Sequence, residues 1–97
     1  METKKLLEVR EFLNLPDSGT VGAIYSSVHY DDWGVAAYLI ITDCSHKIEL
    51  NVDCDTEDQL QNTMYKLNLI TKTIQSLKEA LVLAHTSYKE LQKEEED

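Results

Sequence analysis

The chain has 97 residues, of which 42% are hydrophobic, enough for one small domain with a modest core. Its 18 acidic and 9 basic residues give a formal net charge of −9. That balance argues against binding nucleic acid through phosphate contacts and against docking on an anionic membrane, because both need clustered Lys and Arg. No apolar run approaches the roughly 20 residues that span a bilayer, and Glu8 interrupts any signal-peptide core, so we expect a cytoplasmic protein.

The first 15 residues carry the pattern of an amphipathic helix. Leu6, Val9 and Leu13 recur at i, i+3 and i+7, which places them on one helical face. Pro16 cannot continue a helix, and the residues after it favour a turn. The sequence therefore predicts a helix over residues 1–15.

Residues 21–53 change from a helical period to the period of two that is typical of strands. We predict strands at 21–30, 35–42 and 47–53, joined by tight turns at 31–34 and 43–46. The third of these alternates cleanly between apolar and polar side chains. Three such strands in succession predict an antiparallel meander with one buried face.

The last segment predicts a long helix over residues 56–93, followed by an acidic, frayed tail at 94–97. Thr56 and Gln59 have the spacing of a capping box, and no Gly or Pro interrupts the chain after them. The fold class expected is α+β, with the order α-βββ-α in a single domain, residues 1–97. The meander packs against the long helix, and the N-terminal helix closes the edge or end of the sheet.

The long helix carries a heptad pattern of apolar residues that its own sheet is too short to cover. At 1.5 Å per residue the helix is about 50 Å long, roughly twice the length of one strand. An exposed heptad seam favours a coiled-coil-like homodimer. The dimer interface that we predict comprises Ile74, Leu77, Leu81, Ala84, Tyr88 and Leu91.

The negative charge is concentrated in the middle of the chain. Residues 11–65 hold ten acidic residues against Lys47 alone, whereas residues 1–10 sum to +1 and residues 66–97 to −1. This region is either a solvated surface that keeps a small protein soluble, or a patch that docks on a basic groove in place of nucleic acid. On the second interpretation, the partner-binding residues are Tyr30, Asp31, Asp32, Trp33, Asp43, Glu49, Asp53, Asp55, Glu57 and Asp58.

Two features near the turns have competing interpretations. Trp33 at a hairpin tip is either an aromatic anchor for a partner or a cover for the edge of the sheet. Cys44 and Cys54 flank one strand and so are held too far apart for a disulfide, which predicts two free thiols. The chain shows no catalytic motif and no zinc-type spacing, so we predict no enzyme activity, no cofactor and no metal.

The order of elements and the acidic 31–58 region resemble small phage anti-CRISPR proteins that imitate DNA. The resemblance implies an inhibitor of viral origin that acts in the host cytoplasm on a protein with a basic surface. Double-stranded-RNA-binding domains share the α-βββ-α order, but they need basic residues that are missing here. Type III secretion chaperones begin with a helix and three strands, an order that Leu6–Asp53 of this chain resembles. They have further strands after the second helix, and this chain has no room for those.

The function expected is therefore that of a non-enzymatic acidic inhibitor that occupies a basic nucleic-acid-binding groove of its target protein. One alternative is a small dimeric assembly or secretion chaperone that binds an extended peptide. Another is a protein that sequesters a small ligand at a dimer interface.

Overall fold

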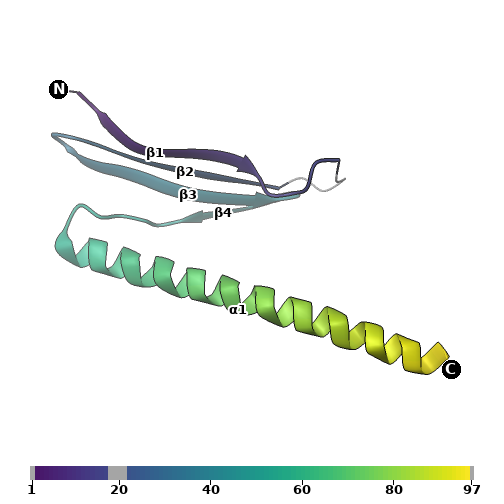
Figure 1. Ribbon diagram of the computed structural model, residues 1–97. Coiled ribbons are helices and arrows are strands. Elements are labelled where there is room, and N and C mark those ends of the chain that lie inside the picture. The colour runs from purple at the N-terminus through teal and green to yellow at the C-terminus, as the bar shows by residue number, and fades with distance from the viewer. Residues whose placement is uncertain (1, 18–21, 97) are drawn as a thin grey trace. The chain divides into compact units, whose positions relative to one another are not determined.

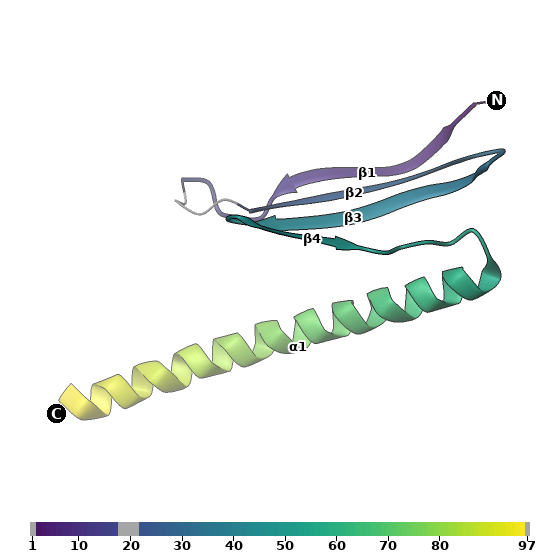
Figure 2. The same cartoon turned by 180° about the vertical axis from the view of Figure 1, so that it is seen from behind.

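The computed structural model describes residues 2–17 and 22–96, which form a four-stranded antiparallel sheet and one long helix. The strands are β1 (Lys4–Phe12), β2 (Gly22–Asp31), β3 (Gly34–Asp43) and β4 (His46–Leu50), and they lie in chain order across the sheet (Figure 1). The view from behind shows the same order, with β1 and β4 as the two edge strands (Figure 2). The helix is α1 (Glu57–Glu96). The expected α+β class is confirmed, but the predicted order is wrong.

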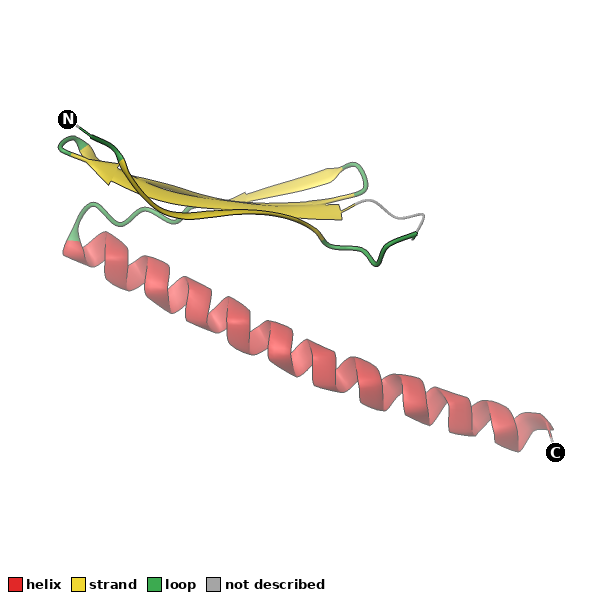
Figure 3. Cartoon of the chain, turned by 45° about the horizontal axis from the view of Figure 1, so that its top comes forward, coloured by secondary structure: helices red, strands yellow, loops and turns green. Residues whose placement is uncertain are grey.

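The correction concerns the N-terminal segment, which is strand β1 and not a helix (Figure 3). β1 pairs with β2 from Lys4 opposite Tyr30 to Phe12 opposite Ala23, with an irregularity between Lys5 and Leu7. That irregularity inserts Leu6 as an extra residue, so the adjacent Leu6 and Leu7 do not follow a strict alternation. A helix of this length is marginal without tertiary support, whereas the strand gains a full ladder along β2.

The other elements lie close to their predicted positions. β4 ends at Leu50, three residues early, because the Asn51 side chain accepts a hydrogen bond from the Asp53 backbone N–H at 2.9 Å and so turns the chain locally. The helix continues through residues 94–96, for which the sequence predicts fraying, because this acidic run contains no helix breaker. Residues 18–21, which include the predicted start of the first strand, and Asp97 lie outside the described residues.

The register of the sheet separates an apolar face from a mixed face. One row of neighbours runs through Ile24, Ile41 and Ile48, and the next row on this face pairs Leu39 with Leu50. The opposite face carries the row Arg10, Tyr25, Ile40 and Glu49. Among the described residues Ala23 is the only buried apolar side chain and still keeps 6% of its surface exposed, so the core of the single chain is small.

The chain divides into two compact units, residues 1–63 and 64–97. The first unit contains the sheet and the first turns of α1. The buried Thr63 hydroxyl donates a hydrogen bond to the Asp53 carbonyl at 2.5 Å, which fastens the start of the helix to the segment before it. The predicted packing of the helix on the sheet and the single-domain organisation stay predictions.

Candidate partner-binding surface

The hairpin between β2 and β3 presents Trp33 at its tip. The carboxylate of Asp31 accepts a hydrogen bond from the Trp33 backbone N–H at 2.8 Å, which closes the turn, and Gly34 follows with φ of 144°. The indole is 85% exposed. Of the two interpretations of Trp33, the one in which it covers the sheet edge is wrong.

Asp55 joins the segment after β4 to this hairpin. Its Oδ1 accepts a hydrogen bond from the Val35 backbone N–H at 2.7 Å. The same oxygen lies 2.8 Å from the place where a Cβ on Gly34 would stand, so the carboxylate can approach only because this residue is glycine. Asp55 thereby comes into the same neighbourhood as the hairpin aspartates.

Further carboxylates follow the β3 side of the sheet towards this hairpin. Glu49 lies opposite Ile40, and Glu49 and Asp53 line one shallow depression with Ala37 and Tyr38. A second depression, at the hairpin itself, is lined by Asp31, Trp33 and Asp55 among others. We use the name acidic edge for the five carboxylates on this side and at its tip: Glu49, Asp53, Asp55, Asp31 and Asp32.

The start of α1 adds two more acidic residues beyond Asp55. The predicted capping box is confirmed, because the Gln59 N–H donates to Thr56 Oγ1 at 3.1 Å and the Thr56 N–H donates to Gln59 Oε1 at 3.2 Å. Glu57 and Asp58 occupy the first turn, where negative side chains favour the helix dipole. Part of their role is therefore structural.

The structure gathers some of the ten predicted partner-binding residues near the hairpin and leaves three apart, namely Glu49, Asp43 and Tyr30. Asp31, Asp32, Trp33, Asp53 and Asp55 lie at or next to the hairpin, and Glu57 and Asp58 follow directly along the chain. Glu49 lies farther along the edge, about 20 Å from the hairpin at 3.3 Å per residue. Asp43 pairs with Gly22 and His46 at the opposite end of the sheet, and Tyr30 belongs to the apolar face, opposite Val35.

The other edge of the sheet, β1, carries basic residues. Lys5 donates a hydrogen bond to Glu8 at 2.7 Å, and Lys4 lies 3.7 Å from Glu2. The hydrogen bond and the positive charge of Lys5 hold the pKa of Glu8 below its ordinary value. The sheet thus has an acidic edge on the β4 side and alternating charges on β1.

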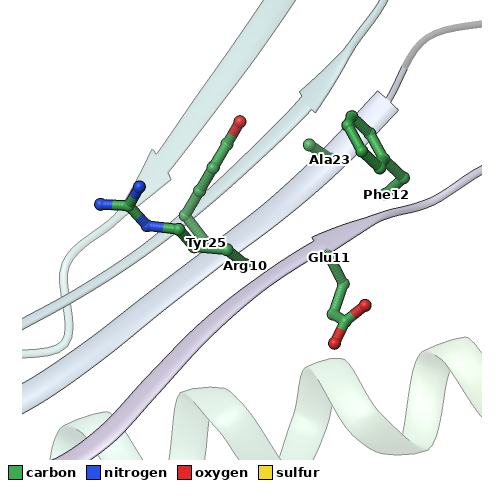
Figure 4. Close-up of a pocket in the computed structure, with 5 residues that line it drawn as sticks. All are labelled: Arg10, Glu11, Phe12, Ala23 and Tyr25. Atoms are coloured by element: carbon green, nitrogen blue, oxygen red, sulfur yellow. The ribbon is translucent and has the colours of Figure 1, made fainter.

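Sequence reasoning missed a depression on the mixed face because it predicted a helix for β1. Arg10 and Tyr25 are direct cross-strand neighbours, and Phe12 lies opposite Ala23, whereas Glu11 points to the other face (Figure 4). Phe12 is 78% exposed. The period of two in Glu8, Arg10 and Phe12 is the signal that could have placed these side chains together.

Within residues 2–17 and 22–96, no group of three or more His, Cys, Asp or Glu side chains is placed so that it could hold a metal ion. Cys44 and Cys54 are free thiols. Across the same described ranges, no helix has the length and apolar character needed to cross a bilayer.

The predicted dimer residues all lie on α1. Five of them, Ile74, Leu77, Leu81, Tyr88 and Leu91, are 50–60% exposed, and Ala84 is exposed as well.

Comparison of the chain with protein-family models, with curated proteins and with solved structures found no match.

Proposed function

We propose that this protein is a non-enzymatic binding protein that docks its acidic edge on the basic surface of a protein partner. The observation that carries the proposal is the convergence of carboxylates from two separate segments, residues 31–32 and 53–55, on a hairpin whose tip exposes Trp33. A line of charge beside an exposed aromatic side chain offers both electrostatic attraction and a hot-spot anchor.

The partner class that fits best is a protein with a nucleic-acid-binding groove. Alternate positions of a strand are about 6.6 Å apart, and one DNA strand presents a phosphate about every 3.4 Å of its axis. Carboxylates on a rigid sheet edge can therefore occupy a groove built for phosphates and displace its counterions. In that role the chain acts as an inhibitor, and phage counter-defence is the setting that we favour.

The test compares two variants with the same change of net charge. The double variant Asp32→Lys/Asp53→Lys alters the acidic edge. It spares Asp31 and Asp55, whose carboxylates accept hydrogen bonds from backbone N–H groups. Glu94→Lys with Glu95→Lys is the matched control at the far end of α1. Each tagged protein is used as bait in nuclease-treated lysate, and the captured proteins are quantified and tested for release of labelled duplex DNA.

We expect the wild type and the tail variant to retain a DNA-binding protein whose DNA the wild-type chain displaces. The edge variant should lose at least about tenfold in affinity for that partner, since several charge contacts are reversed together. Equal capture by all three baits, or stronger loss with the tail variant, would show that the acidic edge is not the interface.

A second candidate function rests on the outer edge of β1. Within the described residues this nine-residue strand pairs with β2 alone, so its other side can accept an extended peptide as an added strand, as a chaperone would. Capture of this kind depends on backbone hydrogen bonds, so it should change little between about 50 and 200 mM salt. Docking of the acidic edge should weaken steeply over the same range.

A further inference from the structure

The distal half of α1 carries more apolar surface than the sheet of the same chain can cover. The helix has 40 residues and the longest strands have ten, which correspond to lengths of about 60 Å and 33 Å. The helix is therefore longer than the sheet by about 18 residues at 1.5 Å per residue, wherever it lies. The apolar side chains of those residues need a different surface to bury them. The segment from Ile74 to Leu91, with its exposed apolar side chains, has that length.

We infer that a second copy of this chain covers the segment, with the two helices antiparallel. In heptad terms Ile74, Leu81 and Tyr88 occupy a positions, and Leu77, Ala84 and Leu91 occupy d positions. An antiparallel pair sets each a position against a d position of the other copy. One register then pairs Ile74 with Leu91, Leu77 with Tyr88 and Leu81 with Ala84.

This register uses the whole exposed segment and then ends. Because the two copies are related by a two-fold axis, each of the three pairings occurs twice, which gives six apolar layers. The pairing of Leu81 with Ala84 combines a large with a small side chain. The next layer would place Ile70 against Glu95 of the second copy, where the apolar pairing stops. The boundaries of the interface therefore follow from the sequence itself.

The charges favour antiparallel over parallel pairing. A parallel pair would bring the two acidic ends, residues 94–96, side by side, and like charges at that distance repel. In the antiparallel register each acidic end lies beside residues 69–71 of the other copy, close to Lys66 and Lys72. The six flanking e and g positions within residues 73–92 contain no acidic residue; they are Thr73, Lys78, Ala80, His85, Ser87 and Gln92.

The apolar area is sufficient for a specific dimer of moderate affinity. Six seam side chains from each copy, at about 100 Å² each, remove on the order of 1,200 Å² from water. That value is at the lower end of the range for specific interfaces. We therefore expect a dissociation constant in the micromolar range.

The first test measures mass in solution by sedimentation and light scattering. At about 100 μM, well above a micromolar Kd, the wild type should have twice the chain mass of 11.1 kDa. Leu81→Glu buries two carboxylates at the centre of the seam and should raise the dimer Kd about 100-fold or more. The control Thr86→Glu adds the same charge on the opposite face of the helix and should leave the dimer intact. A monomeric or tetrameric wild type would overturn the inference.

The second test reads the orientation directly and does not depend on a disruptive variant. In a chain with Cys44→Ser and Cys54→Ser, one sample carries Ile74→Cys and another carries Leu91→Cys. Antiparallel pairing predicts a disulfide-linked dimer when the two are mixed and oxidised, and none in either alone, since like positions lie about 25 Å apart. Cross-linking of Leu91→Cys with itself would show a parallel pair. Neither test involves a partner protein, so both are independent of the proposed function.

Discussion

At the scale of single residues, Gly34 decides whether the hairpin and the segment after β4 can meet. Its φ of 144° is poorly accessible to residues with a Cβ, and that atom would stand 2.8 Å from Asp55 Oδ1. We expect Gly34→Ala to lower the free energy of unfolding by about 1–3 kcal/mol, measured by urea denaturation.

The contribution of the close approach can be separated from that of the backbone. Asp55→Ala removes the carboxylate and its hydrogen bond to Val35, so in that background Gly34→Ala should cost less, retaining only the part due to φ. An equal cost in both backgrounds would mean that the contact with Asp55 contributes nothing.

Trp33 and the carboxylates show how far the sequence predicts the role of single residues. The sequence predicts a turn at Asp31–Gly34 and leaves open whether Trp33 is exposed there or covers the sheet edge, whereas the acidic excess of residues 11–65 is visible by counting. The position of Asp55 against the hairpin is not predictable in this way, because it depends on a hydrogen bond between residues 20 positions apart. The sequence therefore indicates which residues could bind a partner but not which of them gather.

At the scale of elements, the segments bounded by clear turn signals or carrying one clear period were predictable, and the N-terminal segment was not. Turns bound β2 and β3, β4 alternates cleanly and α1 carries a heptad pattern, and the bounds of these elements differ from the predicted ones by one to three residues. In β1 the helical spacing of Leu6, Val9 and Leu13 competes with a strand interrupted by an irregularity, and pairing along β2 decides the outcome. Local pattern cannot report a ladder that forms with a distant partner.

The start of α1 offers a test at the same scale. Thr56→Ala removes the side-chain acceptor of the capping box and should lower the free energy of unfolding by about 1 kcal/mol. Thr71→Ala is a matched control inside the helix. The Thr71 hydroxyl donates its hydrogen bond to the Leu67 carbonyl of the same helix, and alanine has a higher helix propensity than threonine. That control should leave stability unchanged or raise it, as followed by circular dichroism at increasing urea. A Thr56→Ala protein as stable as the wild type would show that the cap is dispensable.

At the scale of the whole molecule, two surfaces of different chemistry share one chain of net charge −9. The acidic edge offers carboxylates and one exposed indole, whereas the distal seam of α1 offers apolar side chains flanked by uncharged or basic positions. Apolar burial does not depend on ion screening in the way that docking of charges does. The two kinds of association should therefore respond to salt in opposite directions.

Raising the salt concentration from about 50 to 500 mM shortens the Debye length from above 10 Å to below 5 Å. Self-association should tighten slightly, by about two- to threefold, because two chains of charge −9 repel each other less while the seam itself is unaffected. Binding to the basic partner should weaken by at least about 100-fold over the same range. Sedimentation of the chain alone and titration with the captured partner measure the two responses separately. If self-association also weakened with salt, the second copy would be held by charge pairs and the apolar register proposed for residues 74–91 would be wrong.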